Sequence, residues 1–510
     1  MPSGLRPRGE PGCVEHEVKR RFSNVVGLAA QTLPFTVDGV LSGTALVVAG
    51  VTFAIDAITP AISIIVLFAG SVLLAWRSIA ADLGHRIART AVLGGVLLWY
   101  VYPAFVTWLV PESASIEWQK YPRRVVAEAL FCVAIFQFAA VIAMHTLGGS
   151  RSGSSRRPER SGDRIPIIAL ASCFIGSLPY VILGSGLKDV LAGILGSRSI
   201  DKPWMPTSNL GDSGSAYIYL ALSCMIAGAV LLWLSCLDGR LGRTKRLALG
   251  LMAFVATLVV YFDSGTRSIL GLTVVPPIVV LARRIYARSR ARAILVAGAA
   301  AVLLVVLLQF QVLYRVAGTA PVGVTDQPFE HWLTLGGNID YFSETAFGVF
   351  VVPDFHDFFH ESVWAQFLVS PIPRYLWPEK PIPQMVSYFS LQRAGLYIYH
   401  EGGNLLPGVV AQNYMSWGWP GIVAAGGTFG LVAARIDHFI QRNAVTTDDY
   451  FYGLYVMAAV WLAVSFRLMS PGFLYPVLAA CGMVWLGRRL AAPSMTAHGH
   501  ARARISERLS

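Results

Sequence analysis

The sequence predicts an all-α polytopic membrane protein with about 12 transmembrane helices and one large outward-facing loop. The 510 residues are 55% hydrophobic and only 14% charged, with a mean hydropathy of +0.57, whereas soluble domains carry roughly 25% charged residues. The apolar runs are continuous and close to bilayer length. Because lipid tolerates only helices or closed barrels, runs without alternation favour helices. Residues 314–407 form the only long hydrophilic segment among these runs.

We expect twelve spans, at residues 26–54, 60–76, 90–110, 125–147, 165–187, 216–236, 247–263, 268–283, 293–313, 408–434, 450–469 and 472–488. They divide the chain into an N-terminal tail (1–25), a first membrane domain (26–313), a periplasmic loop (314–407), a second membrane domain (408–488) and a C-terminal tail (489–510). The first apolar region follows Lys19-Arg20-Arg21 and is too long for a signal peptide, so we expect an uncleaved anchor there.

Lysine and arginine predict the orientation, because cytoplasmic segments carry an excess of both. With the N-terminus inside, the inner segments hold 29 of the 41 Lys and Arg residues, and 12 remain outside or at outer ends of spans. Both termini are therefore expected in the cytoplasm and the long loop outside. The net charge of +12 reflects these inner segments and does not indicate nucleic-acid binding.

The positions of the cysteines and the absence of nucleotide-binding motifs argue against several functions. None of the six cysteines falls in the long loop, so a disulfide framework there is excluded, and no CxxC pair suggests a metal. The sequence contains no Walker motif and no GxGxxG after a strand, so an ATP-driven reaction is unsupported.

Arg267 is the most informative single residue of the sequence. It lies in Asp263-Ser264-Gly265-Thr266-Arg267-Ser268, a tight turn between two apolar runs at the expected outer surface. A charge there is costly unless it is paired or faces a polar cavity. Arg267 either closes the turn through an ion pair with Asp263 or points into an outward-facing cavity, where a guanidinium suits phosphate.

The long loop contributes further candidates for binding. Arg315 at its start is either an interfacial anchor or a ligand-binding residue, and Arg374 and Arg393 lie deeper in the loop. Prolines on both sides of Arg374 stiffen its backbone. Tyr375 and Trp377 can stack on sugar faces or lie at the lipid interface, which is the more common use.

His400 and Glu401 are the candidates for a general base, because either side chain can take a proton near neutral pH. The alternative for each is an ordinary hydrogen bond within the loop. They precede Gly402-Gly403, where backbone could approach a ligand closely. His356 and His360 would share one face of a helix, with Asp357 and Glu361 as further ligands, but the motif is not HExxH. A surface or cavity-edge helix without a metal is the favoured interpretation.

The span after the loop begins with polar residues, among them Gln412 and Tyr414. Gly418, Pro420 and Gly421 are expected to kink or thin that helix. The alternative use of these small residues is helix packing, which is common in membranes.

These features together resemble the O-antigen polymerases, which are Wzy-type oligosaccharide repeat-unit polymerases, and more distantly the O-antigen ligases. The resemblance rests on the layout of spans and loop, the Ser-Gly-Thr-Arg turn at Arg267, the Pro-Arg-Tyr-Leu-Trp-Pro-Glu-Lys-Pro run at 373–381, and the stretch 402–421. The motifs cover only residues 263–421. Gln412 stands where many relatives have an acidic residue, which puts a catalytic carboxylate there in doubt and leaves Glu401 or His400.

The resemblance implies a membrane glycosyltransferase of the C-type fold in the bacterial inner membrane. Its donor would be a glycan on undecaprenyl pyrophosphate, its acceptor a hydroxyl of another lipid-linked repeat unit, and its product a longer surface polysaccharide such as O-antigen, capsule or exopolysaccharide. The implied partners are this lipid-linked glycan, membrane lipid, a chain-length regulator protein and a flippase. No cofactor or divalent metal is required if arginines hold the pyrophosphate. The implied substrate contacts are Arg267, Arg315, Arg374, Tyr375, Trp377, Lys380, Arg393, Asn404, Gln412 and Tyr414.

Two other functions remain open. An O-antigen ligase would perform the same chemistry with lipid A-core as the acceptor. A transporter or flippase for lipid-linked sugars would place ionisable groups near the midplane of broken helices, whereas the charged residues of this chain crowd the expected outer surface and the loop.

Overall fold

The computed structural model is all-helical over the part of the chain that it describes. The described residues are 37–54, 60–82, 86–114, 118–146, 164–184, 186–195, 213–264, 267–317, 339–361, 363–369, 372, 376–381, 384–394, 406–443, 448–467, 469 and 471–491.

Ten helices in these ranges are long and apolar enough to cross a membrane, as expected of a multi-pass membrane protein. They are the helix Val37–Ala54, α2 (Pro60–Asp82), the continuous run α3 (Ile87–Val96), η1 (Leu97–Val101) and α4 (Tyr102–Leu109), α5 (Arg123–Thr146), α6 (Ile165–Leu183), α8 (Ser213–Leu237), α9 (Arg243–Ser264), α10 (Arg267–Tyr286), α11 (Arg290–Ala317) and α16 (Gly408–Asn443). Two further apolar helices, α17 (Asp449–Ser465) and α18 (Pro471–Ala491), pack against each other and against α8.

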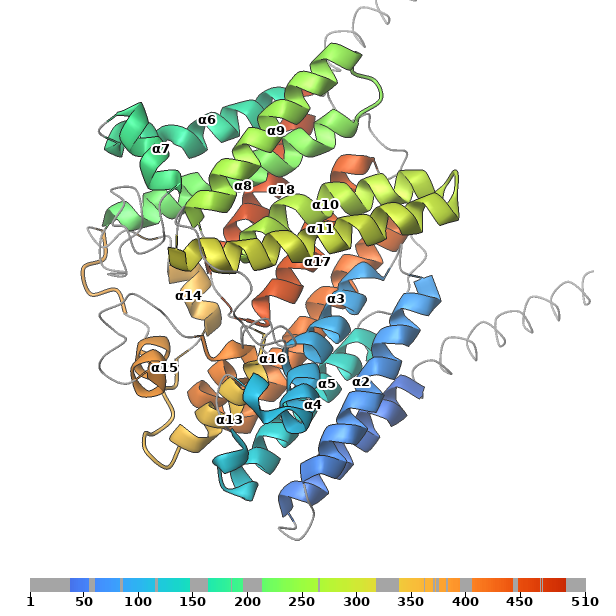
Figure 1. Cartoon of the computed structure of the whole chain (residues 1–510), viewed down its shortest axis with the longest axis vertical. Coiled ribbons are helices and arrows are strands. Elements are labelled where there is room, and N and C mark those ends of the chain that lie inside the picture. The colour runs from blue at the N-terminus through green and yellow to red at the C-terminus, as the bar shows by residue number, and fades with distance from the viewer. Residues whose placement is uncertain are drawn as a thin grey trace, which may run out of the picture.

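Shorter helices gather at one end of the long ones, at the left in Figure 1. They are η2 (Pro111–Ser113), η3 (Trp118–Lys120), α7 (Leu187–Leu195), α13 (Tyr341–Val351), α14 (Val363–Val369) and α15 (Met385–Ala394). We call this end the cap end. The opposite end carries the turns 238–242 and 287–289, and we call it the basic end because Arg240, Arg284 and Arg488 lie there.

Aromatic side chains fill the centre of the bundle, and apolar side chains also cover its outside. The rings of Phe136, Phe429 and Phe466 lie within 5.0–5.6 Å of one another, centroid to centroid. On the outer helices, Leu247 of α9 is 75% exposed and Leu295 of α11 is 72% exposed. Such an apolar exterior is costly in water and is satisfied by lipid tails.

The helices α5 and α16 pack closely because glycines of α16 face the backbone of α5. Gly426 and Gly430 are four residues apart and lie against the carbonyl oxygens of Phe136 and Ala140. A methyl group at either glycine would collide with that backbone. Small residues at this spacing are a common way for membrane helices to approach one another.

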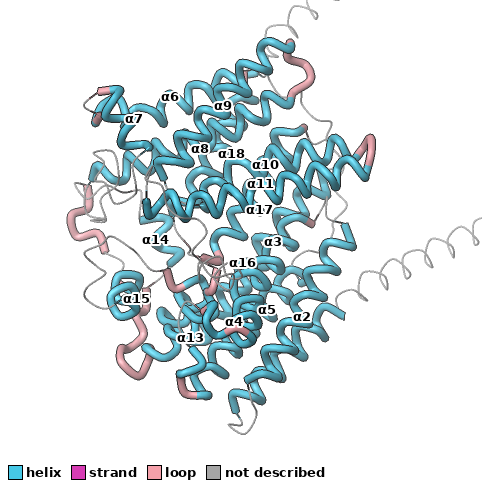
Figure 2. Tube along the Cα trace, viewed as in Figure 1, coloured by secondary structure: helices cyan, strands magenta, loops and turns pink. Residues whose placement is uncertain are grey.

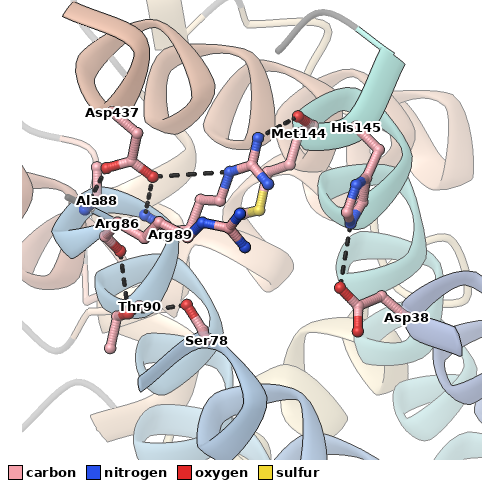
Figure 3. A network of polar contacts seen from close by, with 9 residues as sticks. All are labelled: Asp38, Ser78, Arg86, Ala88, Arg89, Thr90, Met144, His145 and Asp437. Atoms are coloured by element: carbon pink, nitrogen blue, oxygen red, sulfur yellow. Dashed lines mark hydrogen bonds and ion pairs between the residues drawn. The ribbon is translucent and has the colours of Figure 1, made fainter. Parts of the chain in front are cut away.

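A polar network ties helix ends together at the basic end (Figure 3). Asp437 of α16 is 1% exposed and accepts hydrogen bonds from the backbone N–H groups of Ala88 (2.9 Å) and Arg89 (3.2 Å) at the start of α3. The guanidinium of Arg89 lies 3.6 Å from the same carboxylate and donates to the carbonyl oxygen of Met144 in α5. The carboxylate of Asp437 therefore satisfies otherwise unpaired N–H groups of a helix start, as a capping residue does.

Candidate functional site at the cap end

The helix α16 is interrupted at Gly418, as the sequence predicted for this part of the span. Gly418 has φ 64° and ψ −149°, a conformation that is almost restricted to glycine. In a straight helix, residues 413 and 421 would lie about 12 Å apart along the axis. Here a Cβ atom on Gly421 would clash with the carbonyl oxygen of Asn413 and lie 2.9 Å from Cβ of Trp417. The chain therefore folds back at Gly418, so that residues 408–417 lie against the start of 419–443.

This break leaves backbone carbonyl groups without a partner in the helix. Residues 352–361, which we call the cap segment, donate hydrogen bonds to them. The carbonyl oxygen of Ser416 would normally accept from the residue four positions on, but that residue is Pro420, which has no N–H. It accepts instead from the N–H of His360 at 2.9 Å, and the carbonyl oxygen of Met415 accepts from the N–H of Phe359 at 3.0 Å. The indole of Trp417 donates to the carbonyl oxygen of Glu361 at 3.1 Å.

The prediction of a helix around His356 and His360 is therefore wrong. The helix α13 ends at Val351, and residues 352–361 form a turn, a bend and an extended segment. His360 has φ 51°, and its ring lies 4.9 Å from that of Trp417, whereas the ring of His356 stacks on Phe359 at 4.2 Å. Within the described ranges, no three His, Cys, Asp or Glu side chains are grouped so that they could hold a metal ion.

The N-terminus of α16 is buried and capped by other helices. The N–H of Val409 donates to the carbonyl oxygen of Phe466 (2.9 Å), and the N–H of Val410 donates to the hydroxyl of Tyr100 (3.2 Å). The Tyr100 hydroxyl in turn donates to the Phe466 carbonyl oxygen (2.9 Å). That carbonyl is available because α17 has already ended at Ser465. Two of the N–H groups that a helix start leaves unpaired are thus satisfied inside the protein.

The helix α13 lies parallel to the first half of α16, and both start at the same depth. Tyr341 contacts Gly408, and further along both helices Gly348 contacts Ala411. Asp340 precedes α13, is 1% exposed and accepts from the N–H of Ser343 at 3.1 Å. The N-terminal end of a helix carries partial positive charge. Because α13 and α16 start beside each other, two such partial charges lie close together below the cap end.

Arg467 occupies the non-helical turn between α17 and α18, directly after the carbonyl group that caps α16. Its Nε atom is enclosed by protein and has no hydrogen-bond partner among the described residues. The other described arginines with such an Nε atom, Arg89, Arg246 and Arg488, belong to the helix ends of the basic end. An arginine inside an apolar bundle is costly, and it commonly marks a functional position. From the sequence, Arg467 is one of the 12 basic residues expected outside or at outer ends of spans, and no pattern around it singles it out.

Glu128 and Tyr414 form a second polar pair at this end. The Tyr414 hydroxyl donates to Oε1 of Glu128 at 2.8 Å, and Tyr414 is 3% exposed. Glu128 lies near the start of α5, inside the expected span 125–147, so the sequence does contain a signal for it: an acidic residue in an apolar run. Glu128 is not among the site residues predicted from the sequence.

Four of the predicted site residues have described side chains, and they fall into two groups. Gln412 and Tyr414 lie in the first half of α16, where Gln412 is 1% exposed and its Oε1 accepts from the N–H of Met469 at 3.2 Å. Gln412 thus fixes the turn between α17 and α18. Trp377 and Lys380 lie in a turn of the cap, in which the Lys380 N–H donates to the Trp377 carbonyl oxygen at 3.1 Å. The Nζ atom of Lys380 donates to the carbonyl oxygen of Ile372 at 3.0 Å.

The remaining predicted site residues cannot be placed from the described part of the chain. Residues Arg374, Tyr375, His400, Glu401 and Asn404 lie outside the described residues, and so do the side chains of Arg267, Arg315 and Arg393. The neighbourhood of Arg267 is described on one side only: Asp263, its expected ion-pair partner, accepts a hydrogen bond from the hydroxyl of Tyr180 at 2.8 Å.

Comparison with known sequences matches residues 337–477 to a domain of unknown function, DUF8712. This match extends from just before α13 to the first part of α18, so it includes α13, α14 and α15 of the cap end, the folded-back α16 and Arg467. No curated protein and no solved structure matches the chain.

Proposed function

We propose that this protein polymerises undecaprenyl-pyrophosphate-linked oligosaccharide repeat units into a surface polysaccharide at the periplasmic face of the bacterial inner membrane. It is then a polyprenyl-pyrophosphate-dependent glycosyltransferase. The donor glycan leaves its lipid pyrophosphate and joins a hydroxyl group of the acceptor repeat unit. A ligase that uses lipid A-core as acceptor would perform the same transfer.

The proposed topology has twelve spans, with α17 and α18 added to the ten long apolar helices. The excess of Lys and Arg in the inner segments favours the basic end in the cytoplasm. The cap end, with residues 314–407, then faces the periplasm. An even number of spans leaves both termini in the cytoplasm.

The observation that carries the proposal is the return of α16 at Gly418. It brings the N-terminal ends of α16 and α13 beside the turn that holds Arg467. The first N–H groups of α16 are already paired within the protein, so the two helix ends contribute only their partial positive charge. The guanidinium of Arg467 is the group that can bind phosphate oxygens through two parallel hydrogen bonds. Groups held in place in this way stabilise the negative charge that develops on a pyrophosphate leaving group.

The residues predicted from the sequence complete this proposal. Arg267, Arg315, Arg374 and Arg393 would contact pyrophosphate or glycan, and Trp377 and Tyr375 would stack on sugar rings. His400 and Glu401 remain candidates for the base. Arginines at the pyrophosphate would leave the reaction independent of a divalent metal.

One observation favours the transporter alternative. Transporters build their substrate sites from interrupted helices, and α16 is interrupted at Gly418. A transporter would move lipid-linked repeat units between the two leaflets without making the glycan longer.

The deciding experiment uses purified protein in liposomes that contain lipid-linked repeat units. A polymerase yields a ladder of longer glycans and releases lipid pyrophosphate, and this should persist in EDTA. Repeat units that change leaflet without growing would contradict the proposal and support transport. Activity that is lost in EDTA and restored by Mg²⁺ or Mn²⁺ would refute metal independence alone. A deletion strain separates the ligase: its loss leaves bare core, whereas loss of a polymerase leaves core with one repeat unit.

A further inference from the structure

We propose that Glu128 is the catalytic base that takes the proton from the acceptor hydroxyl group, with Tyr414 as its positioning residue. This inference rests on the proposed glycan transfer. It assigns the base to α5, in a membrane helix, rather than to the loop residues His400 and Glu401.

The surroundings of Glu128 distinguish it from a lipid-facing or purely structural acid. Its neighbours Val126, Ala127, Ala129 and Leu130 are at most 3% exposed, so α5 is enclosed by protein on these sides. Glu128 itself keeps partial exposure. Part of its side chain is therefore accessible to a molecule that approaches from outside the helix bundle.

The carboxylate of Glu128 also has an oxygen available. Oε1 accepts from Tyr414, whereas Oε2 has no partner among the described residues and is not enclosed. Two other acidic side chains differ from it: both oxygens of Asp437 accept from N–H groups, and the unpaired Oε2 of Glu361 is enclosed by protein. A carboxylate without a cationic partner is the form that can accept a proton from a hydroxyl group.

Glu128 and Arg467 both lie beside the first half of α16. Tyr414 binds Glu128, and Gln412, two residues earlier, binds the N–H of Met469, two residues after Arg467. The proposed base and the arginine proposed for the pyrophosphate are therefore positioned by the same short helical segment.

The transfer balances with these groups alone. The acceptor O–H gives its proton to Oε2 of Glu128 while its oxygen forms a bond to the anomeric carbon of the donor. The bond from that carbon to the pyrophosphate oxygen breaks, and the electron pair leaves with the lipid pyrophosphate. The hydrogen bond from Tyr414 keeps the carboxylate in place, and Glu128 afterwards releases its proton to water.

The test measures the pH dependence of the polymerisation rate in liposomes for the wild type and for Glu128→Gln, Glu128→Asp and Tyr414→Phe. We expect Glu128→Gln to lower kcat about 10²–10⁴-fold with little change in KM, and to abolish the fall in rate at low pH. Glu128→Asp should keep more activity than Glu128→Gln, because the carboxylate remains. Tyr414→Phe should keep the fall in rate at low pH but change the pH at which it occurs.

Tyr450→Phe is the matched control, because Tyr450 is also buried and donates to a single partner, Ser235, but belongs to α17 rather than to the site. It should leave the pH profile unchanged. Glu128→Gln with a rate within about threefold of wild type, or a low-pH fall that disappears in Glu401→Gln or His400→Gln instead, would overturn the inference. If Glu128→Gln does not fold, a wild-type pH profile in both Glu128→Asp and Tyr414→Phe would overturn it as well. A wild-type protein that never lengthens the glycan would refute the proposed function itself.

Discussion

The backbone N–H of His360 donates a hydrogen bond to the carbonyl oxygen of Ser416 at 2.9 Å. This bond exists because Pro420 cannot occupy that carbonyl, and it joins the cap segment to the point at which α16 folds back. The position of the cap segment is thus coupled to the conformation of Gly418.

Gly418→Ala should destabilise the protein, whereas Gly427→Ala in the same helix should not. The alanine at 418 would be forced into a conformation that costs about 1–3 kcal/mol, and its Cβ would lie 3.4 Å from the ring of Phe358. Gly427 is helical with open space around it, so alanine there should gain roughly 0.5–1 kcal/mol. Thermal unfolding in detergent, followed by tryptophan fluorescence, measures both shifts. A midpoint for Gly418→Ala at or above wild type would mean that the fold-back does not depend on glycine.

Asp437→Ala should destabilise the basic end much more than Asp38→Ala does. Asp437 is buried, and its loss leaves two N–H groups without an acceptor and Arg89 without an anionic partner, at a cost of about 3–5 kcal/mol. Asp38 pairs with Arg77 (2.7 Å), whose side chain is 37% exposed, and such pairs contribute about 0–1 kcal/mol. The comparison uses the same unfolding assay. In Asp437→Ala with Arg89→Ala, part of the loss should return, because the unpaired charge is gone; equal losses for the two single variants would contradict the assignment.

Arg467→Gln should abolish polymerisation without reducing the amount of folded protein. Loss of one charge-stabilising donor typically lowers the rate about 10²–10³-fold, and Arg467→Lys should recover only part of it because lysine lacks the planar fork. Arg435→Gln is the control, since Arg435 is exposed near the other end of α16. Chain-length ladders at matched protein levels provide the measurement. Full activity in Arg467→Gln would exclude this arginine from the site.

Arg267→Ala should remain inactive when Asp263→Ala is added. If Arg267 only closed the turn by pairing with Asp263, removing both charges would largely restore function. The hydrogen bond from Tyr180 gives Asp263 a partner on α6, so the acid does not depend on Arg267. Long-chain glycan in the double variant, at wild-type membrane levels, would show that Arg267 is not catalytic.

The proposed orientation predicts opposite labelling of two introduced cysteines. Glu112→Cys lies in the exposed helix η2 at the cap end, and Gly239→Cys lies in the turn between α8 and α9 at the basic end, with open space around it. A membrane-impermeant maleimide applied to cells with a permeabilised outer membrane should label the first and reach the second only after lysis. Equal labelling of both before lysis would contradict the orientation.

The sequence predicted the helical class and most helix positions, because continuous apolar runs of bilayer length have few alternatives. For example, the span expected at 125–147 is α5 at Arg123–Thr146. It also predicted the interruption at Gly418, but not the reversal of the chain there, because glycine and proline indicate a break in a helix without indicating the direction that the chain then takes. The reversal depends on partners that are distant in sequence, such as Phe466 and Tyr100.

The candidate site was less predictable for the same reason. The spacing of His356 and His360 favoured a helix, but hydrogen bonds to the freed carbonyls of Met415 and Ser416 hold this segment extended. Glu128 becomes a candidate only when Tyr414, 286 residues away, is placed beside it. Tertiary contacts of this kind override local patterns.

The capping of α16 also constrains how the protein is made. The N–H group of Val409 finds its partner in the carbonyl of Phe466, 57 residues later in the chain, so the first half of α16 is synthesised before its acceptor. An unpaired N–H group in lipid costs several kcal/mol. Insertion of residues 408–417 must therefore wait for α17, which makes the C-terminal hairpin the step that completes the membrane domain during biogenesis.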